Sequence, residues 1–365
     1  MKLRVNRDVL ADAVAWAARV LPNRPAVPVL SGLLLEADVD LVLSAFDYDV
    51  SARASVEADV VEPGRVLIPG RILAEISRSL PAGWVEIVAS GSEAVLTCGS
   101  AEFALLTMPV EDFPTLPATP PKVGAIGGGI FASAVGQVAP ASSRDEALPM
   151  LTGVRIDIAG ETVTMAATDR YRIAAREFDW RPERADVTAA AMVPARVLVE
   201  VARSLRGGEV SVGLGDGVAG FESVGRSTTV RLLDEQFIDY RSRLTDDWPI
   251  RADVRVAPFI EAIKRVALVA ERNTAIRLSF GQGRVLIQAG GGEIGRGAEV
   301  LDAELSGDDI QIAFQSQFLL DGLAGVETEF VRLNMQSPGR AALITEVPGD
   351  AEPAFRYLVM SRRLP

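Results

Sequence analysis

Paired carboxylates are the side chains in this sequence whose type and spacing could support acid–base chemistry. They occur at Asp145 and Glu146 and again at Asp246 and Asp247. Adjacent residues of a strand point to opposite faces, so neither pair is placed to work on one substrate. The chain has no His and one Cys, which excludes a Ser-His-Asp triad and a multi-thiolate zinc site. We therefore expect no catalytic residues, no metal and no cofactor.

Arginines at a spacing of seven are the other chemical signal. Arg71 and Arg78 share one helix face, and Arg196 and Arg203 repeat the arrangement. Such faces suit a phosphate backbone without reading its sequence. The alternative is an ordinary solvated face on which Glu75 and Glu200 pair with the arginines. The pattern leaves both interpretations open.

The composition of the whole chain is that of a globular protein. Among 365 residues, 48% are hydrophobic and 24% charged, and the net charge is -12. This acidity opposes indiscriminate DNA binding but allows a local basic face. The N-terminus lacks the apolar core of a signal peptide, and no apolar stretch reaches the ~18 residues of a membrane helix. We expect a cytoplasmic protein without membrane contact.

The elements that must position these residues come from an internal repeat. Residues 28–32 match 149–153 at an offset of 121, and residues 69–80 match 194–205 at an offset of 125. A fainter third copy begins with residues 259–263, which match 131–135. Three units of about 122 residues fill the chain, which identifies a repeat architecture.

Each unit is predicted to be α+β, with two amphipathic helices and antiparallel sheet. Helices are expected at residues 10–20, 71–80, 131–138, 196–205 and 259–271. In the second of these, Ile72, Leu73, Ile76 and Leu80 form the predicted buried stripe. A proline-rich segment, 113–121, and a second joint near 246–249 separate the units. The predicted domains are 1–119, 124–246 and 250–365.

Several motifs together resemble the bacterial sliding clamp family, the beta subunit of the replicative DNA polymerase III holoenzyme. They are residues 23–25 (Asn-Arg-Pro), 28–32 (Pro-Val-Leu-Ser-Gly), 46–51 (Phe-Asp-Tyr-Asp-Val-Ser), 108–114 (Met-Pro-Val-Glu-Asp-Phe-Pro), 148–153 (Leu-Pro-Met-Leu-Thr-Gly) and 167–172 (Ala-Thr-Asp-Arg-Tyr-Arg). The resemblance implies three repeated DNA-clamp domains, each with two helices packed on antiparallel sheet, forming a ring as a head-to-tail homodimer. It implies a non-catalytic processivity factor that encircles duplex DNA.

The resemblance also implies three sets of functional residues. Arg24 matches a DNA contact of the family, and the helix arginines Arg71, Arg78, Arg196 and Arg203 are added from their faces. Phe103 and Leu105 resemble one side of the dimer interface, and Leu268 and Val269 the other; the alternative is that all four are core residues.

The third set is a pocket for the short peptide motifs of the replicative polymerase, the clamp loader and repair polymerases. Its predicted residues are Leu151, Thr168, Arg170, Tyr171, Arg172, Ile173, Ile238, Phe318, Leu358, Met360 and Arg362.

Three of the clearest departures from the family pattern fall at this pocket. Ser361 and Ile238 stand where the family has prolines, and Arg362 brings a charge beside an apolar site. Two hypotheses follow. The chain is a general replication clamp that tolerates a variant pocket, or it is a specialised second clamp whose pocket gives resistance to a clamp-directed inhibitor.

Overall fold

The computed structural model describes residues 1–244, 247–270, 275–290, 295–347 and 352–363. The chain forms two compact units, Met1–Gly128 with Arg203–Leu232, and Gly129–Ala202 with Leu233–Pro365. Mixed helices and antiparallel sheets in both units confirm the predicted α+β class. None of the described helices is long and apolar enough to cross a membrane.

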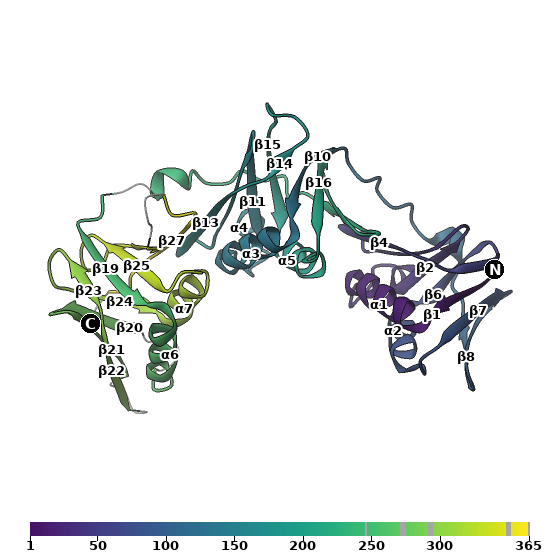
Figure 1. The fold of residues 1–365 in the computed structure, drawn as a ribbon, viewed down its shortest axis with the longest axis horizontal. Helices are drawn as coiled ribbons and strands as arrows, with labels where there is room; N and C mark the ends of the chain where they lie inside the picture. Colours follow the sequence, from purple (N-terminus) through teal and green to yellow (C-terminus); the bar gives the residue numbers. More distant parts are fainter. Residues whose placement is uncertain (245–246, 271–274, 291–294, 348–351, 364–365) are drawn as a thin grey trace. The chain divides into compact units, whose positions relative to one another are not determined.

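The first unit contains a five-stranded sheet and a second, longer sheet (Figure 1). The five-stranded sheet follows the order β5 (Asp59–Glu62), β1 (Lys2–Asn6), β7 (Trp84–Ser90), β8 (Glu93–Cys98), β9 (Ala101–Leu106). Within the first unit, the strands of the longer sheet follow the order β10 (Lys122–Gly127), β16 (Glu209–Gly215), β17 (Val218–Ser223), β18 (Arg226–Arg231), β4 (Val50–Val56), β3 (Leu41–Phe46), β2 (Gly32–Ala37), β6 (Gly64–Pro69). Pairing of β18 with β4 joins strands of the second repeat to strands of the first.

Two helices, α1 (Arg7–Ala17) and α2 (Gly70–Ser79), pack together over the core of the first unit. The side chain of Asn6 caps α1 by accepting a hydrogen bond from the Asp8 N–H at 2.9 Å, so the helix begins three residues before the predicted start. Leu73 and Ile76 of α2 are buried as predicted, but the prediction for Ile72 was wrong, since its side chain is 42% exposed. One hydrophobic position beside the buried stripe therefore faces outward.

The proline-rich linker is packed against the longer sheet. The Leu214 N–H donates to the Pro121 carbonyl at 3.3 Å. A Cβ at Gly213 would lie 2.5 Å from the Pro120 carbonyl oxygen, and one at Gly220 would lie 2.9 Å from Pro120 and Thr119 side-chain carbons. Glycine at these two positions lets the linker approach the strands.

The second unit also contains two sheets. The larger follows the order β15 (Thr188–Pro194), β11 (Gly153–Ala159), β12 (Thr162–Thr168), β13 (Arg172–Asp179), β27 (Phe355–Val359), β26 (Ala342–Glu346), β25 (Phe330–Met335), β19 (Ile250–Arg255), β23 (Glu304–Ser306). The smaller follows the order β22 (Arg296–Asp302), β21 (Arg284–Gly290), β20 (Ala275–Gly281), β24 (Ile310–Gln315). Pairing of β13 with β27 joins the second repeat to the third.

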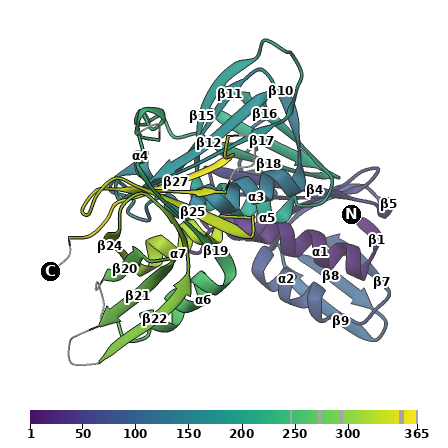
Figure 2. The ribbon, with the colours of Figure 1, turned by 60° about the vertical axis from the view of Figure 1, so that its left-hand side comes forward.

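The remaining helices are α3 (Gly128–Val138), α4 (Pro149–Thr152), α5 (Ala195–Ser204), α6 (Val256–Ala267) and α7 (Ser316–Ala324). Strand β14 (Arg181–Pro182) and five 3₁₀ turns, Ala18–Val20, Pro28–Ser31, Val110–Asp112, Ala139–Ala141 and Arg241–Arg243, complete the described elements. Helix α6 packs on α7 and on β20, β21 and β22, as Figure 2 shows from the side. The α6 helix ends before the predicted boundary at 271, a residue that lies outside the described residues.

Candidate binding groove and arginine faces

A tight turn between β12 and β13 presents Tyr171 to solvent. Asp169 Oδ1 accepts hydrogen bonds from the N–H groups of Tyr171 and Arg172, at 3.0 and 3.1 Å. Arg170 has a φ of 79°, which the turn requires. The first repeat has the same device: Asp47 Oδ1 accepts from the N–H groups of Asp49 and Val50, and Tyr48 has a φ of 71°. The turn is therefore a structural feature of the repeat, used at the groove in the second unit.

Arg172 lies beneath this turn, and its buried guanidinium group connects several segments of the chain. Its Nε donates to Asp169 Oδ2 at 2.9 Å, and its Nη1 donates to Asp321 Oδ2 at 2.5 Å and to the Tyr357 hydroxyl at 3.1 Å. The guanidinium carbon lies 4.4 Å from the centre of the Phe318 ring. Burial alone would lower the pKa of Arg172, but Tyr357, Asp321 and Asp169 outweigh it and raise that pKa above its ordinary value.

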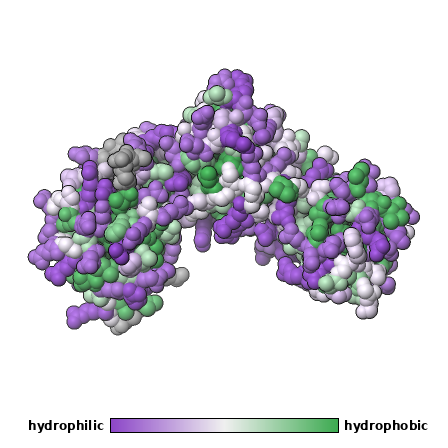
Figure 3. Space-filling model, viewed as in Figure 1, coloured by the Kyte–Doolittle hydropathy of each residue, from purple (hydrophilic) through white to green (hydrophobic). Residues whose placement is uncertain are grey.

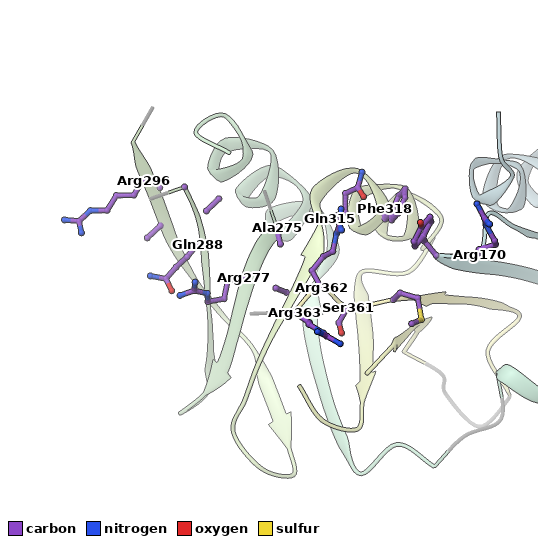
Figure 4. Close-up of a pocket in the computed structure, with 17 residues that line it drawn as sticks. Arg170, Ala275, Arg277, Gln288, Arg296, Gln315, Phe318, Ser361, Arg362 and Arg363 are labelled. Carbon is purple, nitrogen blue, oxygen red and sulfur yellow. The ribbon is translucent and has the colours of Figure 1, made fainter. Parts of the chain in front are cut away.

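A groove of about 1330 Å³ opens beside the turn, and Figure 4 shows the side chains that line it. Five predicted pocket residues line it: Arg170, Tyr171, Phe318, Met360 and Arg362. The rings of Tyr171 and Phe318 stack with centroids 6.1 Å apart, and the Met360 N–H donates to the Tyr171 carbonyl at 2.8 Å. This end of the groove offers two aromatic faces and a thioether, which suits apolar side chains of a peptide.

The other six predicted pocket residues do not line the groove. Leu151, Ile173 and Leu358 are buried, and the last two belong to one core cluster with Tyr240 and Trp248. Thr168 is also buried and donates to the Arg172 carbonyl at 2.7 Å. Ile238 is 41% exposed but lies outside the lining. Arg172 is the sixth of these residues. All of them except Ile238 are buried and support the fold.

Sequence reasoning missed a second group of lining residues. Arg277 on β20, Gln288 on β21 and Arg296 on β22 extend the groove, together with Arg363 of the C-terminal segment. Successive side chains of β20 point to opposite faces of the sheet. Arg277 therefore lies on the face opposite to its buried neighbours Ile276 and Leu278. That alternation predicts which face is polar, but it gives no sign that the face borders the groove.

The arginines predicted to contact DNA are exposed side chains: Arg24, Arg71, Arg78, Arg196 and Arg203. Arg71 has a local role as well. Its Nη2 donates to Asn23 Oδ1 at 2.7 Å and to the carbonyls of Leu21 and Pro22 at 3.3 Å. Arg71 therefore holds the segment that leads to Arg24.

The predicted dimer residues divide by exposure. Phe103, on the sheet-edge strand β9, is 37% exposed, and Leu268, directly after α6, is 81% exposed. The alternative interpretation as core residues is therefore wrong for these two. Leu105 packs against the core of the first unit, and Val269 is half-buried. Figure 3 shows apolar side chains at the surface of the unit that carries β7 and β8.

Comparisons with known proteins give one consistent result. Three family models match the chain. The model of the N-terminal domain of the DNA polymerase III beta subunit matches residues 1–117, that of the central domain matches residues 125–239, and that of the C-terminal domain matches residues 247–363. The chain is 50% identical to the beta sliding clamp of Streptomyces coelicolor over 100% of both chains. It is 40% identical to the beta sliding clamp homolog GriR of Streptomyces muensis, over 100% of this chain and 99% of that one.

Solved structures agree with the sequence comparisons. The DNA polymerase III beta subunit of Pseudomonas aeruginosa is 27% identical with a TM-score of 0.92, and both chains are covered completely. A clamp of the same organism bound to griselimycin is 28% identical with a TM-score of 0.93, again over both complete chains. The repeated α+β domains, the repeated Asx turn and these matches show that the chain belongs to the beta sliding clamp family and is a non-catalytic processivity factor of DNA polymerase III.

Proposed function

We propose that two copies of this clamp form a closed ring around duplex DNA, each contributing domains 1–119, 124–246 and 250–365. Two exposed apolar ends support this assembly, one on the edge strand β9 with Phe103 and one after α6 with Leu268. Different surfaces at the two ends make a head-to-tail contact, which closes when the rotation is two-fold. A ring on the chromosome works in the cytoplasm of a bacterial cell.

The DNA face of this ring is built from Arg24, Arg71, Arg78, Arg196 and Arg203. All five side chains are exposed, and the protein as a whole has a net charge of -12. Weak phosphate contacts permit sliding, because they do not depend on sequence and exchange readily with counterions. The acidic remainder of the surface opposes binding of DNA elsewhere.

The partner site is the groove beside the β12–β13 turn. The observation that carries this proposal is the exposed Tyr171 stacked on Phe318 with Met360 at their side. An apolar concave site with a few polar groups is the usual form of a ligand pocket. The replicative polymerase, the clamp loader and repair polymerases would dock there through short peptide motifs.

Retention on circular DNA tests the ring. The clamp is loaded onto a nicked circular plasmid by a clamp loader and separated from free protein by gel filtration. The clamp is expected to elute with the plasmid and to leave it after one restriction cut, because a linear molecule lets a ring slide off. Equal retention on circular and linear plasmid would show binding by affinity and would contradict the ring.

A specialised, inhibitor-resistant clamp is the second candidate function, favoured by Ser361, Arg362 and Ile238 at the predicted pocket. Ser361 and Arg362 line the groove. The higher identity to the Streptomyces coelicolor clamp than to GriR favours the general replication role. Griselimycin, the ligand of the Pseudomonas aeruginosa clamp structure, discriminates between them. A specialised clamp would bind it at least a hundredfold more weakly than an ordinary clamp while it keeps its partner peptides.

A further inference from the structure

The groove has a charge opposite to that of the protein. Five arginines are among its 17 lining residues, and none of these residues is an Asp or Glu. The chain as a whole has 49 acidic and 37 basic residues. Within the described part of the chain, none of the five lining arginines forms an ion pair. The groove therefore presents positive charge that no acidic side chain of the described residues neutralises.

Four of these arginines lie away from the aromatic end and are here called the arginine surface: Arg277, Arg296, Arg362 and Arg363. Arg277 is paired in register with Gln288, and Arg296 with Gly290, so both occupy one open face of the small sheet. The opposite face carries the buried residues Ile276, Leu278 and Ile287 under α6. Figure 4 shows the side chains that line the groove, which extend from Phe318 past Arg362 to Arg296.

The C-terminal segment completes the arginine surface. The Arg362 N–H donates to the Ala313 carbonyl of β24 at 2.7 Å, which fixes this segment along the edge of the small sheet. The side chains of Arg362 and Arg363 remain exposed. The arginine surface is thus continuous with the apolar end of the groove, where the Met360 N–H donates a hydrogen bond to the Tyr171 carbonyl.

Two polar atoms in the groove lack hydrogen-bond partners. Arg277 Nε and Ser361 Oγ are shielded from solvent, and neither has a partner among the described residues. Leaving a shielded donor without a hydrogen-bond partner is unfavourable. Both atoms belong to residues that line the groove.

We propose that the arginine surface binds acidic residues that flank the apolar motif of partner peptides; this rests on the proposed docking role of the groove. Carboxylates match the planar guanidinium fork of Arg277 and Arg296 and accept from the amide of Gln288. A peptide is favoured over a nucleic acid because the same groove continues into the apolar site of Tyr171, Phe318 and Met360. The surface then selects partners by charge next to the motif.

Fluorescence anisotropy with three labelled peptides tests this inference. One carries a Gln-Leu-x-Leu-Phe motif with neutral flanks, and two carry the same motif with three aspartates before or after it. One of the acidic peptides is expected to bind about tenfold tighter than the neutral peptide at low salt, and this gain should shrink at high salt. In Arg277→Gln, the affinity of the tighter acidic peptide divided by the affinity of the neutral peptide is expected to fall to about one.

Two further variants make the result specific. Arg296→Gln, at an exposed position, should also reduce the ratio and serves if Arg277→Gln fails to fold. Arg340→Gln, an exposed arginine outside the groove lining, removes the same charge and should keep the full gain. A gain that survives both groove variants would overturn the proposal.

The remaining outcomes separate the two proposals. If the neutral peptide binds and neither acidic peptide binds tighter, the arginine surface has no acidic ligand and only this inference falls. If none of the three peptides binds, the docking role falls with it. If a labelled single-stranded oligonucleotide binds the intact clamp but not Arg277→Gln, and acidic flanks give no gain, the surface binds phosphate and the proposal is wrong.

Discussion

At the residue scale, two arginines that were predicted to contact ligands support the fold. Arg172 connects Asp169, Asp321 and Tyr357 beneath the groove, and its side chain is 8% exposed. Arg71 holds the segment before Arg24. An arginine has five donors in a fixed plane, so it can organise several acceptors from distant segments at once. Such residues influence binding through the shape of the site.

Replacement of Arg172 by Met should destabilise the second unit. Asp169 and Asp321 would lose their cation while they remain mostly buried, at a cost of about 2–4 kcal/mol. Urea denaturation of Arg172→Met against the parent chain measures this change. Arg170→Met, at the exposed neighbouring position, is the matched control and should change stability little. Equal stability of both variants would show that the ion pairs and hydrogen bonds of Arg172 contribute nothing to the free energy of unfolding.

Two buried tyrosines should limit stability at alkaline pH. Burial, followed by the charge of Asp157, raises the pKa of Tyr240, and burial also raises the pKa of Tyr357 despite the opposing effect of Arg172. Above the unfolded pKa of about 10, the unfolded chain releases these protons while the folded chain keeps them, so stability falls as pH rises.

The slope of stability against pH measures this effect. Each tyrosine contributes a loss of up to about 1.4 kcal/mol per pH unit above pH ~10. In Tyr240→Phe the slope should be shallower than in the parent chain. An identical slope in both proteins would mean that Tyr240 does not titrate differently on folding.

At the element scale, strand pairing joins successive repeats into continuous sheets. β18 pairs with β4 in the first unit, and β13 pairs with β27 in the second. Ser51 Oγ and Thr229 Oγ1 are 2.6 Å apart across the first junction, and both residues are buried. A buried cross-strand hydroxyl pair favours one register, because a shift would leave both groups unsatisfied.

Replacement of Thr229 by Val should weaken this junction by about 1–2 kcal/mol, because the buried Ser51 hydroxyl loses its partner. The double variant with Ser51→Ala removes both hydroxyls and should recover part of the loss. Unfolding of the two single variants and the double variant completes a double-mutant cycle. Strictly additive losses would show that the two hydroxyls do not interact.

At the scale of the whole molecule, function depends on ring closure between copies. Phe103 on β9 and Leu268 after α6 are large apolar side chains left exposed by the fold of one chain. Exposed edge strands and apolar patches are typical of surfaces that pair with another chain. The proposed dimer would cover both.

Leu268→Asp should break the proposed dimer. A carboxylate in an apolar interface is expected to weaken association about a hundredfold, because it must lose its hydration. Sedimentation at micromolar concentration should give twice 38.8 kDa for the parent chain and 38.8 kDa for the variant. Val39→Asp changes a residue that is 81% exposed outside the proposed contact, and this control should remain dimeric. A monomeric parent chain would contradict the ring.

The sequence by itself determined the repeat, the α+β class and most of the helix faces, with Ile72 as an exception. Arg71 and Arg78 were predicted to be exposed from spacing alone, and Leu73 and Ile76 to be buried. These properties depend on local periodicity, which a sequence displays directly. The motif at residues 167–172 led to Tyr171 as a pocket residue only through its resemblance to the family, and the structure shows that Asp169 holds the turn that presents it.

Only the tertiary structure decided which of these residues are open to a ligand. Arg172 is enclosed by Asp321 and Tyr357, which lie 149 and 185 residues away in the chain. Arg277 borders a groove because the segment with Ser361 and Arg362 lies along β24. Burial and unsatisfied donors arise from contacts between distant segments, and local sequence patterns do not encode those contacts.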